Sequence, residues 1–240
     1  MIINEYLRDD NNFEIVDLTY PIESEMLVNT GLRRPIFEWL MRINSEGLNV
    51  TKMDMIVHSG THIDAPYHAI ADGQTIDEIP PRRFFGRAKL FRASNAKYSS
   101  EIKLEDVEKS GFSIDKNTIF VLETGIEKYS NTKEYNLKYS VPSMELVDWL
   151  IEKGISAFMT DITNIDFPDE CDFKRHKLLL GANIPIVENL RNLSRIPFNE
   201  EFLICALPLP LKGREGSPCR AVAIMKPENN TASDKEKNDV

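Results

Sequence analysis

The spacing of apolar and polar residues predicts a chain of short strands separated by turns and a few helices. Residues 13–19 alternate in the manner of a half-buried strand, and Pro21 follows them. Residues 118–122 form a continuous apolar run, which is typical of a strand covered on both faces. Further apolar segments predict strands at 50–57, 87–92, 155–159, 184–187, 202–207 and 219–225.

Two segments have the period of an amphipathic helix. Residues 102–109 carry apolar side chains at 102, 104 and 107, and Gly111 follows as a stop. Pro142 opens a second helix at 143–153, and Gly154 ends it. Because this second helix lies between two apolar strands, we expect a right-handed crossover and an at least partly parallel sheet, that is, an α/β fold.

The remaining stretches give weaker signals. Residues 23–47 have a mixed pattern, and either an irregular loop or one short helix fits them. Prolines and glycines between 208 and 218 predict a shaped loop. From residue 226 onward the chain is polar and charged, which predicts a disordered tail. We find no repeat and no linker, so residues 1–225 are expected to form one domain and residues 226–240 a tail.

A histidine-rich stretch at residues 58–68, His-Ser-Gly-Thr-His-Ile-Asp-Ala-Pro-Tyr-His, holds three of the four histidines of the chain. Neutral imidazole and carboxylate are ligands that zinc, manganese and iron accept, so His58, His62 and Asp64 are candidate metal ligands. A glycine, β-branched residues and a proline in this stretch disfavour a helix, and apolar residues 55–57 precede it. We therefore expect these ligands at a strand end and the turn that follows it.

Three protein ligands leave positions for water or substrate, as a catalytic metal site requires. Asp64 has two carboxylate oxygens and can bridge two ions, so a second group of ligands is expected further along the chain. The candidates are the remaining histidine, His176, and Glu188, which ends an apolar run. On spacing alone, a surface histidine and a solvated carboxylate are the simpler interpretation of these two residues.

Composition narrows the class of protein. The 240 residues, 42% of them hydrophobic, suffice for one sizeable core. A net charge of −9 argues against a nucleic-acid surface, which needs clustered Lys and Arg. No apolar stretch approaches the roughly 20 residues that a bilayer requires, and the first residues lack a signal-peptide pattern, so we expect a cytoplasmic protein without nucleic-acid or membrane partners. Three widely spaced cysteines predict reduced thiols.

The histidine-rich stretch resembles the HxGTHxDxPxH signature of the bacterial kynurenine formamidase and cyclase family of metal-dependent amidohydrolases, which also includes isatin hydrolases. Weaker marks along the chain agree with this resemblance, which covers residues 14–225 apart from an insert at 126–141. These marks are Asp17-Leu18-Thr19, Thr124-Gly125, residues 161–166 with Asn164 in place of the usual serine, His176, Glu188-Asn189-Leu190, and the closing segments 208–211 and 216–221.

The resemblance implies an α/β/α fold of cyclase-like (swivelling) type with a mixed sheet, in a homodimer or a larger homo-oligomer. It also implies that His58, His62 and Asp64 hold one ion, and that Asp64, His176 and Glu188 hold, or lie near, a second. The expected cofactor is Zn²⁺, as one or two ions, with Mn²⁺ as the alternative.

His68 resembles the catalytic histidine of the family. A histidine, with an unperturbed pKa of about 6.5, suits transfer of a proton from water to a leaving nitrogen; packing in the turn is the alternative role. The resemblance implies hydrolysis of an amide in a small-molecule substrate, most concretely of N-formyl-L-kynurenine to L-kynurenine and formate. Hydrolysis of a cyclic amide or lactone, and metal binding without turnover, are the competing functions.

Several other residues are candidates for supporting roles. Asp161 or Asp166 is expected to orient a ligand imidazole, and Asp161 is the stronger candidate because it follows a buried strand. Cys171 has no neighbours that would activate a thiol, so we expect a structural or surface cysteine. The aromatic residues that suit the lining of a pocket for an aryl substrate are Phe37, Trp39 and Tyr67.

Overall fold

The computed structural model describes residues 13–29, 31–93 and 99–226, and its centre is a closed β-barrel. Seven of the described strands form the barrel, and pairing between the last and the first of them closes it. In order around the barrel they are β12 (Gly216–Met225), β11 (Glu201–Pro208), β5 (Phe85–Arg92), β7 (Ile119–Glu123), β9 (Phe158–Thr160), β10 (Ile186–Glu188) and β4 (His62–Asp64). An eighth strand, β1 (Glu14–Asp17), pairs with β12.

The sheet is mixed, as expected from the crossover in the sequence. Neighbours among β5, β7, β9 and β10 are parallel, and the other pairs are antiparallel. The predicted strand, helix, strand unit is β7, α4 (Met144–Lys153) and β9. The mixed α/β class is therefore confirmed, whereas the strands close on themselves instead of forming an open sheet between two helical layers.

Alternation along the strands divides the apolar residues between two cores. On β7, Ile119 and Val121 pack into the core shared with β1, β11 and β12, whereas Phe120 and Leu122 pack against the helices. This explains why the strand reads as a continuous apolar run. Small side chains such as Ala88 recur in the first core, which is typical of a narrow barrel interior.

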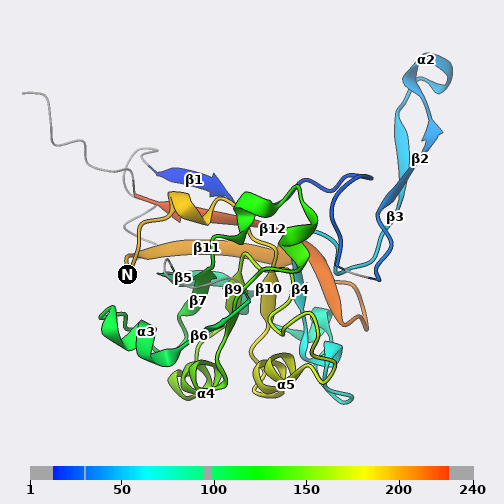
Figure 1. Cartoon of the computed structure of the whole chain (residues 1–240). Coiled ribbons are helices and arrows are strands. Elements are labelled where there is room, and N and C mark those ends of the chain that lie inside the picture. The colour runs from blue at the N-terminus through cyan, green and yellow to red at the C-terminus, as the bar shows by residue number, and fades with distance from the viewer. Residues whose placement is uncertain (1–12, 30, 94–98, 227–240) are drawn as a thin grey trace, which may run out of the picture.

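Three helices cover one side of the barrel in Figure 1. They are α3 (Leu104–Lys109), α4 and α5 (Lys174–Gly181), of which α5 lacks a clear signal in the sequence. A small parallel pair, β6 (Glu101–Ile102) and β8 (Val141–Pro142), lies beside them. The described residues contain no helix with the length and apolar character needed to cross a bilayer. The 3₁₀ helices span Pro66–His68, Ile76–Glu78, Pro81–Arg83, Ile126–Tyr129, Lys133–Asn136 and Leu193–Arg195.

A hairpin arm projects from the body of the molecule (Figure 1). It consists of β2 (Ile36–Met41) and β3 (Val50–Asp54), with the short helix α2 (Ile43–Glu46) between them. Every residue of both strands is exposed. The strand predicted at 50–57 is thus shorter than expected and belongs to the arm, not to the barrel. Of the predicted tail, residues 227–240 lie outside the described residues.

Candidate metal centre

Strand β4 places two candidate ligands on one face of the barrel wall. His62 and Asp64 are two residues apart, so their side chains point the same way, while Ile63 between them packs into the core. Glu188 on β10 lies directly opposite His62 in the antiparallel register, and it therefore joins the same face. The Nε2 atom of His62 is 3.4 Å from Oδ1 of Asp64 and 3.6 Å from Oε2 of Glu188.

His58 reaches this centre from the turn before β4. Gly60 in that turn has a φ of +67°, a conformation that glycine adopts without strain. The Nδ1 atom of His58 lies 2.7 Å from Oδ1 of Asp64. A Cβ atom at Gly216 on β12 would come within 2.9 Å of Cε1 of His58, so the lack of a side chain at 216 makes room for the imidazole.

His176 enters the centre from α5, far along the chain. Its Nδ1 lies 2.6 Å from Oδ2 of Asp166, and its Nε2 lies 3.6 Å from Oδ2 of Asp64 and 3.5 Å from Oε1 of Glu188. The ring of His62 has the same arrangement, because its Nδ1 is 2.9 Å from the carbonyl oxygen of Gly60. In both rings one nitrogen is held by the protein and Nε2 points inward, as in metal-ligating histidines.

His68 is the exposed member of the cluster. It ends the 3₁₀ helix Pro66–His68, and its ring centroid is 4.2 Å from that of His58. Among the described residues, ligand atoms of His58, Asp64 and His68 lie within 4.8 Å of one another. Those of His62, Asp64 and Glu188 do so as well, so two potential ligand groups share Asp64.

The charge balance of the centre calls for a cation. Asp64 is 1% exposed, and neither of its oxygens accepts a well-formed hydrogen bond from the described residues, although imidazole nitrogens surround it. Glu188 is buried beside it. Glu188 accepts the backbone N–H of Ile165 at 2.9 Å, but two buried carboxylates side by side are costly unless positive charge compensates them. A set of imidazoles and carboxylates at these distances fits a zinc or manganese ion.

The raised pKa values of His62 and His176 also show that the centre favours positive charge. Burial alone lowers the pKa of His62, but the carboxylate of Asp64 outweighs it and raises that pKa to about 9. Burial also opposes charge on His176, yet hydrogen bonds to Asp166 and Asp64 hold its pKa well above the ordinary value. Burial raises the pKa of Glu188. His68 is exposed at the surface, but its ring is partly enclosed by the cluster. This partial loss of hydration, reinforced by the charges of the neighbouring histidines, lowers the pKa of His68.

The carboxylate that holds a candidate ligand is Asp166, not Asp161 as the sequence suggested. Asp161 accepts hydrogen bonds from the backbone N–H groups of Thr124 at 2.9 Å and Gly125 at 2.8 Å, so it stabilises the turn after β7. Burial raises the pKa of Asp161 to about 7. Both aspartates follow β9, and only the fold distinguishes which one meets His176.

The aromatic residues expected to line a pocket, and Cys171, lie in different parts of the structure. Tyr67 is exposed beside His68, where it is open to a ligand. Phe37 and Trp39 are exposed on β2 of the hairpin arm, which projects from the body of the molecule that holds the histidines (Figure 1). Cys171 is exposed and free.

Comparison with known sequences relates the chain to one family of hydrolases. The model of the Cyclase family matches residues 16–167. Kynurenine formamidase from Bacillus cereus (strain ATCC 14579) is 29% identical over 213 residues, which cover 87% of this chain and 96% of the relative. The Bacillus mycoides (strain KBAB4) protein of the same name is 28% identical over 211 residues, or 86% and 95% of the two chains.

Comparison with solved structures confirms the fold. Isatin hydrolase A from Labrenzia aggregata superposes with a TM-score of 0.85 at 24% identity, over 94% of this chain and all of that chain. A structure described as a potential metal-dependent hydrolase with cyclase activity gives a TM-score of 0.75 at 25% identity, over 89% and 98% of the two chains. The barrel described above is therefore shared with these proteins.

We expect metal binding at this centre to release protons. With a pKa of about 9, the ring of His62 is protonated at neutral pH in the metal-free protein, and it must lose that proton to coordinate an ion. The apparent affinity for Zn²⁺ therefore rises with pH from about 6.5 to 8.5, by up to about tenfold per pH unit for each proton released. Calorimetric titration in buffers of different ionisation enthalpy measures the number of protons, and a binding heat that is the same in every buffer contradicts this prediction.

Proposed function

Because the chain belongs to the Cyclase family, we propose that it is a metal-dependent hydrolase of amide bonds. The observation that supports this most strongly is the buried Asp64 carboxylate, whose oxygens accept no well-formed hydrogen bond from the described residues and lie among imidazole nitrogens, next to an exposed histidine, His68. Imidazole and carboxylate ligands suit Zn²⁺, with Mn²⁺ as the alternative. The open side at His68 leaves access for water and substrate.

The residues that would hold the metal, as one ion or two, are His58, His62, Asp64, His176 and Glu188. A divalent cation bound there supplies a Lewis acid, which acidifies water and polarises a carbonyl group. The chain itself fixes the geometry of this chemistry, because the Nδ1 atoms of two ligand rings are held by Asp166 and by the backbone. No serine or cysteine nucleophile is needed.

His68 moves the proton in this proposal. Its lowered pKa keeps the ring neutral near pH 7, so it is able to accept a proton from the attacking water. As the C–O bond forms and the C–N bond breaks, His68 passes that proton to the leaving nitrogen. The oxygen and one hydrogen of the water thereby end in the acid product, and the other hydrogen ends on the nitrogen of the amine product.

We propose N-formyl-L-kynurenine as the substrate, with L-kynurenine and formate as products. The curated relatives at 28–29% identity, which are named kynurenine formamidase, support this choice. A cyclic amide of the isatin type is the second candidate, supported by the structural likeness to isatin hydrolase A. Both compounds are amides of an aryl amine, so the same attack and the same proton transfer serve either one. The exposed ring of Tyr67 beside His68 suits an aryl group.

Replacement of His68 by Ala tests the proton transfer. We expect kcat to fall by about 10²- to 10⁴-fold, the usual contribution of general acid–base catalysis, while the metal content per chain stays the same. Metal analysis and steady-state kinetics on the purified variant measure both quantities. Asp72→Ala, at an exposed position shortly after His68, is the control and should keep full activity. Full turnover by the His68 variant excludes the proposed role, and loss of metal instead makes His68 a ligand.

A substrate panel tests the reaction. Protein stripped with a chelator is expected to lose activity, and added Zn²⁺ or Mn²⁺ to restore it. Initial rates on N-formyl-L-kynurenine, isatin and an aryl lactone then rank the candidates, and we expect the formamide to be the best substrate. A higher rate on isatin instead supports the second candidate, hydrolysis of a cyclic amide. Metal binding without hydrolysis of any compound in the panel indicates a metal-binding protein and contradicts the proposed hydrolase.

We further propose that the chain is a homodimer and that the hairpin arm belongs to its interface. A two-stranded hairpin alone is only marginally stable in water. This one exposes large apolar side chains along its whole length, including Trp39 at 48% and Leu40 at 56%. A second copy provides a matching surface through two-fold symmetry, because each arm then meets the same region of the partner.

Size-exclusion chromatography with light scattering tests the dimer. The wild-type chain is expected at about twice its mass of 27.5 kDa. The double variant Trp39→Ser, Leu40→Ser removes two exposed apolar side chains from the arm and should shift the protein toward the monomer. Glu38→Gln on the same strand serves as the control. A wild-type mass of 27.5 kDa at micromolar concentration refutes this proposal.

A further inference from the structure

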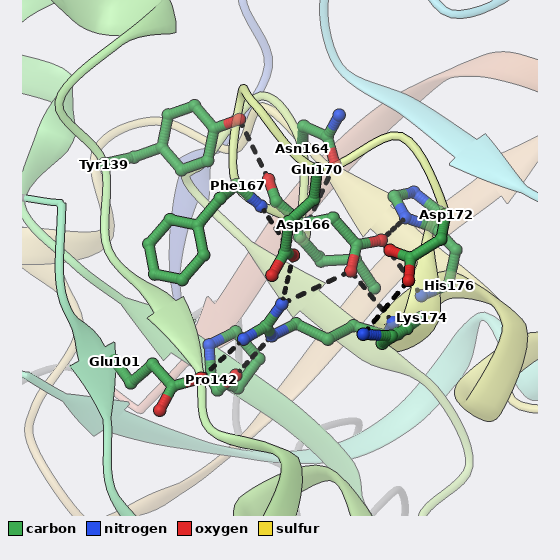
Figure 2. A network of polar contacts seen from close by, with 12 residues as sticks. Glu101, Tyr139, Pro142, Asn164, Asp166, Phe167, Glu170, Asp172, Lys174 and His176 are labelled. Carbon is green, nitrogen blue, oxygen red and sulfur yellow. Dashed lines mark hydrogen bonds and ion pairs between the residues drawn. The ribbon is translucent and has the colours of Figure 1, made fainter.

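Arg175 is a buried arginine beside the candidate metal centre, and the proposed reaction does not use it. It precedes His176 in α5, and its side chain is only 2% exposed. Burying a guanidinium group is costly unless its N–H groups are paired. Figure 2 shows the polar network to which Glu101, Pro142, Asp166, Glu170 and His176 belong.

The outer side of the guanidinium group is paired with three different segments. Its Nε donates to the carbonyl oxygen of Pro142 at 2.7 Å. One terminal nitrogen donates to Glu101 at 2.7 Å and the other to Glu170 at 2.6 Å. Both glutamates are partly open to solvent, with side chains 42% and 31% exposed. They bring negative charge to Arg175 without being part of the metal centre.

The inner side of Arg175 meets the carboxylate that holds a metal-ligand candidate. Oδ1 of Asp166 lies 3.4 Å from the guanidinium group and accepts the backbone N–H of Arg175 at 2.9 Å. Oδ2 of Asp166 lies 2.6 Å from Nδ1 of His176 and accepts the backbone N–H of His176 at 3.3 Å. One oxygen of Asp166 thus faces Arg175 and the other faces His176.

We propose that Arg175 is a positioning residue of the metal centre, which acts by fixing the Asp166 carboxylate that aims the His176 ring. A carboxylate held at both oxygens is not free to rotate about its Cβ–Cγ bond, so Nδ1 of His176 has one place to donate. Nε2 of the same ring then faces Asp64 and Glu188. The inference rests on the proposed metal centre but not on the identity of the substrate.

The start of α5 strengthens this argument. The helix has no N-cap side chain of its own and follows Phe173, which has a φ of +50°. Asp166 takes over that role through the backbone N–H groups of Arg175 and His176. The first turn of α5, which carries a metal-ligand candidate, is therefore anchored by a carboxylate outside the helix, and Arg175 holds that carboxylate in place.

Lysine should substitute poorly for arginine here. The planar guanidinium group reaches Pro142, two glutamates and Asp166 at once, whereas an ammonium group is a point charge on a flexible stem. Arg175→Lys keeps the charge but gives up this simultaneous contact. Arg175→Met keeps much of the side-chain volume and removes every polar contact of the side chain, while the backbone N–H of residue 175 still donates to Asp166.

Metal affinity of the full-length protein, measured by competition with a chromophoric Zn²⁺ chelator, tests the proposal. We expect Arg175→Met to weaken Zn²⁺ binding by about 10- to 100-fold and Arg175→Lys to fall between it and wild type. Glu101→Gln is the matched control, because it removes the negative charge of one half-exposed contact and leaves Asp166 and His176 in place; it should stay within about threefold of wild type. The absorption spectrum of the Co²⁺ form, which reports ligand geometry, should change in the Arg175 variants and not in the control.

A double-mutant cycle separates positioning from general stabilisation. If Arg175 acts through Asp166, then adding Arg175→Met to Asp166→Asn weakens Zn²⁺ binding by less than about twofold beyond Asp166→Asn alone. Fully additive losses contradict the proposal, because they show an effect that bypasses Asp166.

The remaining outcomes are also decisive. If Arg175→Met does not fold, the Lys variant decides, and a folded Arg175→Lys protein with wild-type affinity and an unchanged Co²⁺ spectrum overturns the positioning role. A folded Arg175→Met protein that binds Zn²⁺ with wild-type affinity also overturns the positioning role. That result does not affect the proposed function. A wild-type chain that binds neither Zn²⁺ nor Co²⁺ refutes the metal centre itself, and this inference with it.

Discussion

A buried carboxylate without adequate hydrogen-bond donors is the constraint on which this structure depends. Asp64 lies in a three-residue strand that pairs with β10 on one side and β12 on the other, so closing the barrel buries it. Imidazoles from the preceding turn, from β4 itself and from α5 enclose it. Protons on these rings or a bound cation must neutralise it, and the same requirement makes the centre a candidate site for a metal.

The parts of the fold and site that depend on local sequence are predictable. Apolar runs identify β7, β9 and β10 because a strand inside a barrel with helices on its outer side is covered on both faces. Helix α4 is predictable because Ser143 caps its start and Gly154 ends it in a left-handed conformation. The candidate ligands at 58, 62 and 64 are close in the chain, so their spacing alone suggests a metal.

The remaining features arise from contacts between distant residues. Closure of the barrel needs β4 to pair with β12, which follows it by some 150 residues, and nothing in either segment encodes that pairing. Helix α5 begins with four polar residues, Lys174 to Lys177, and borrows its cap from Asp166, so it lacks a local start signal. The pattern of residues 23–47 predicts a loop or one short helix, yet these residues contain β2 and α2 of the arm. The strand predicted from residue 50 exists as β3, but its sequence carries no record of whether a protein surface lies beneath it.

The insert at 126–141 shows how a segment without the family's sequence marks still bears on the centre. The hydroxyl group of Tyr139 donates to the backbone carbonyl of Asp166 at 3.0 Å. The hydroxyl group of Tyr135 contacts the carbonyl of Asp161 at 3.1 Å and the side chain of Asn189 at 3.2 Å. These bonds hold both loops that supply the second half of the centre, the one with Asp166 and the one after Glu188. Because a displacement of about 1 Å is enough to disturb such a site, the insert shares in setting the geometry around His176 although none of its residues is a candidate ligand.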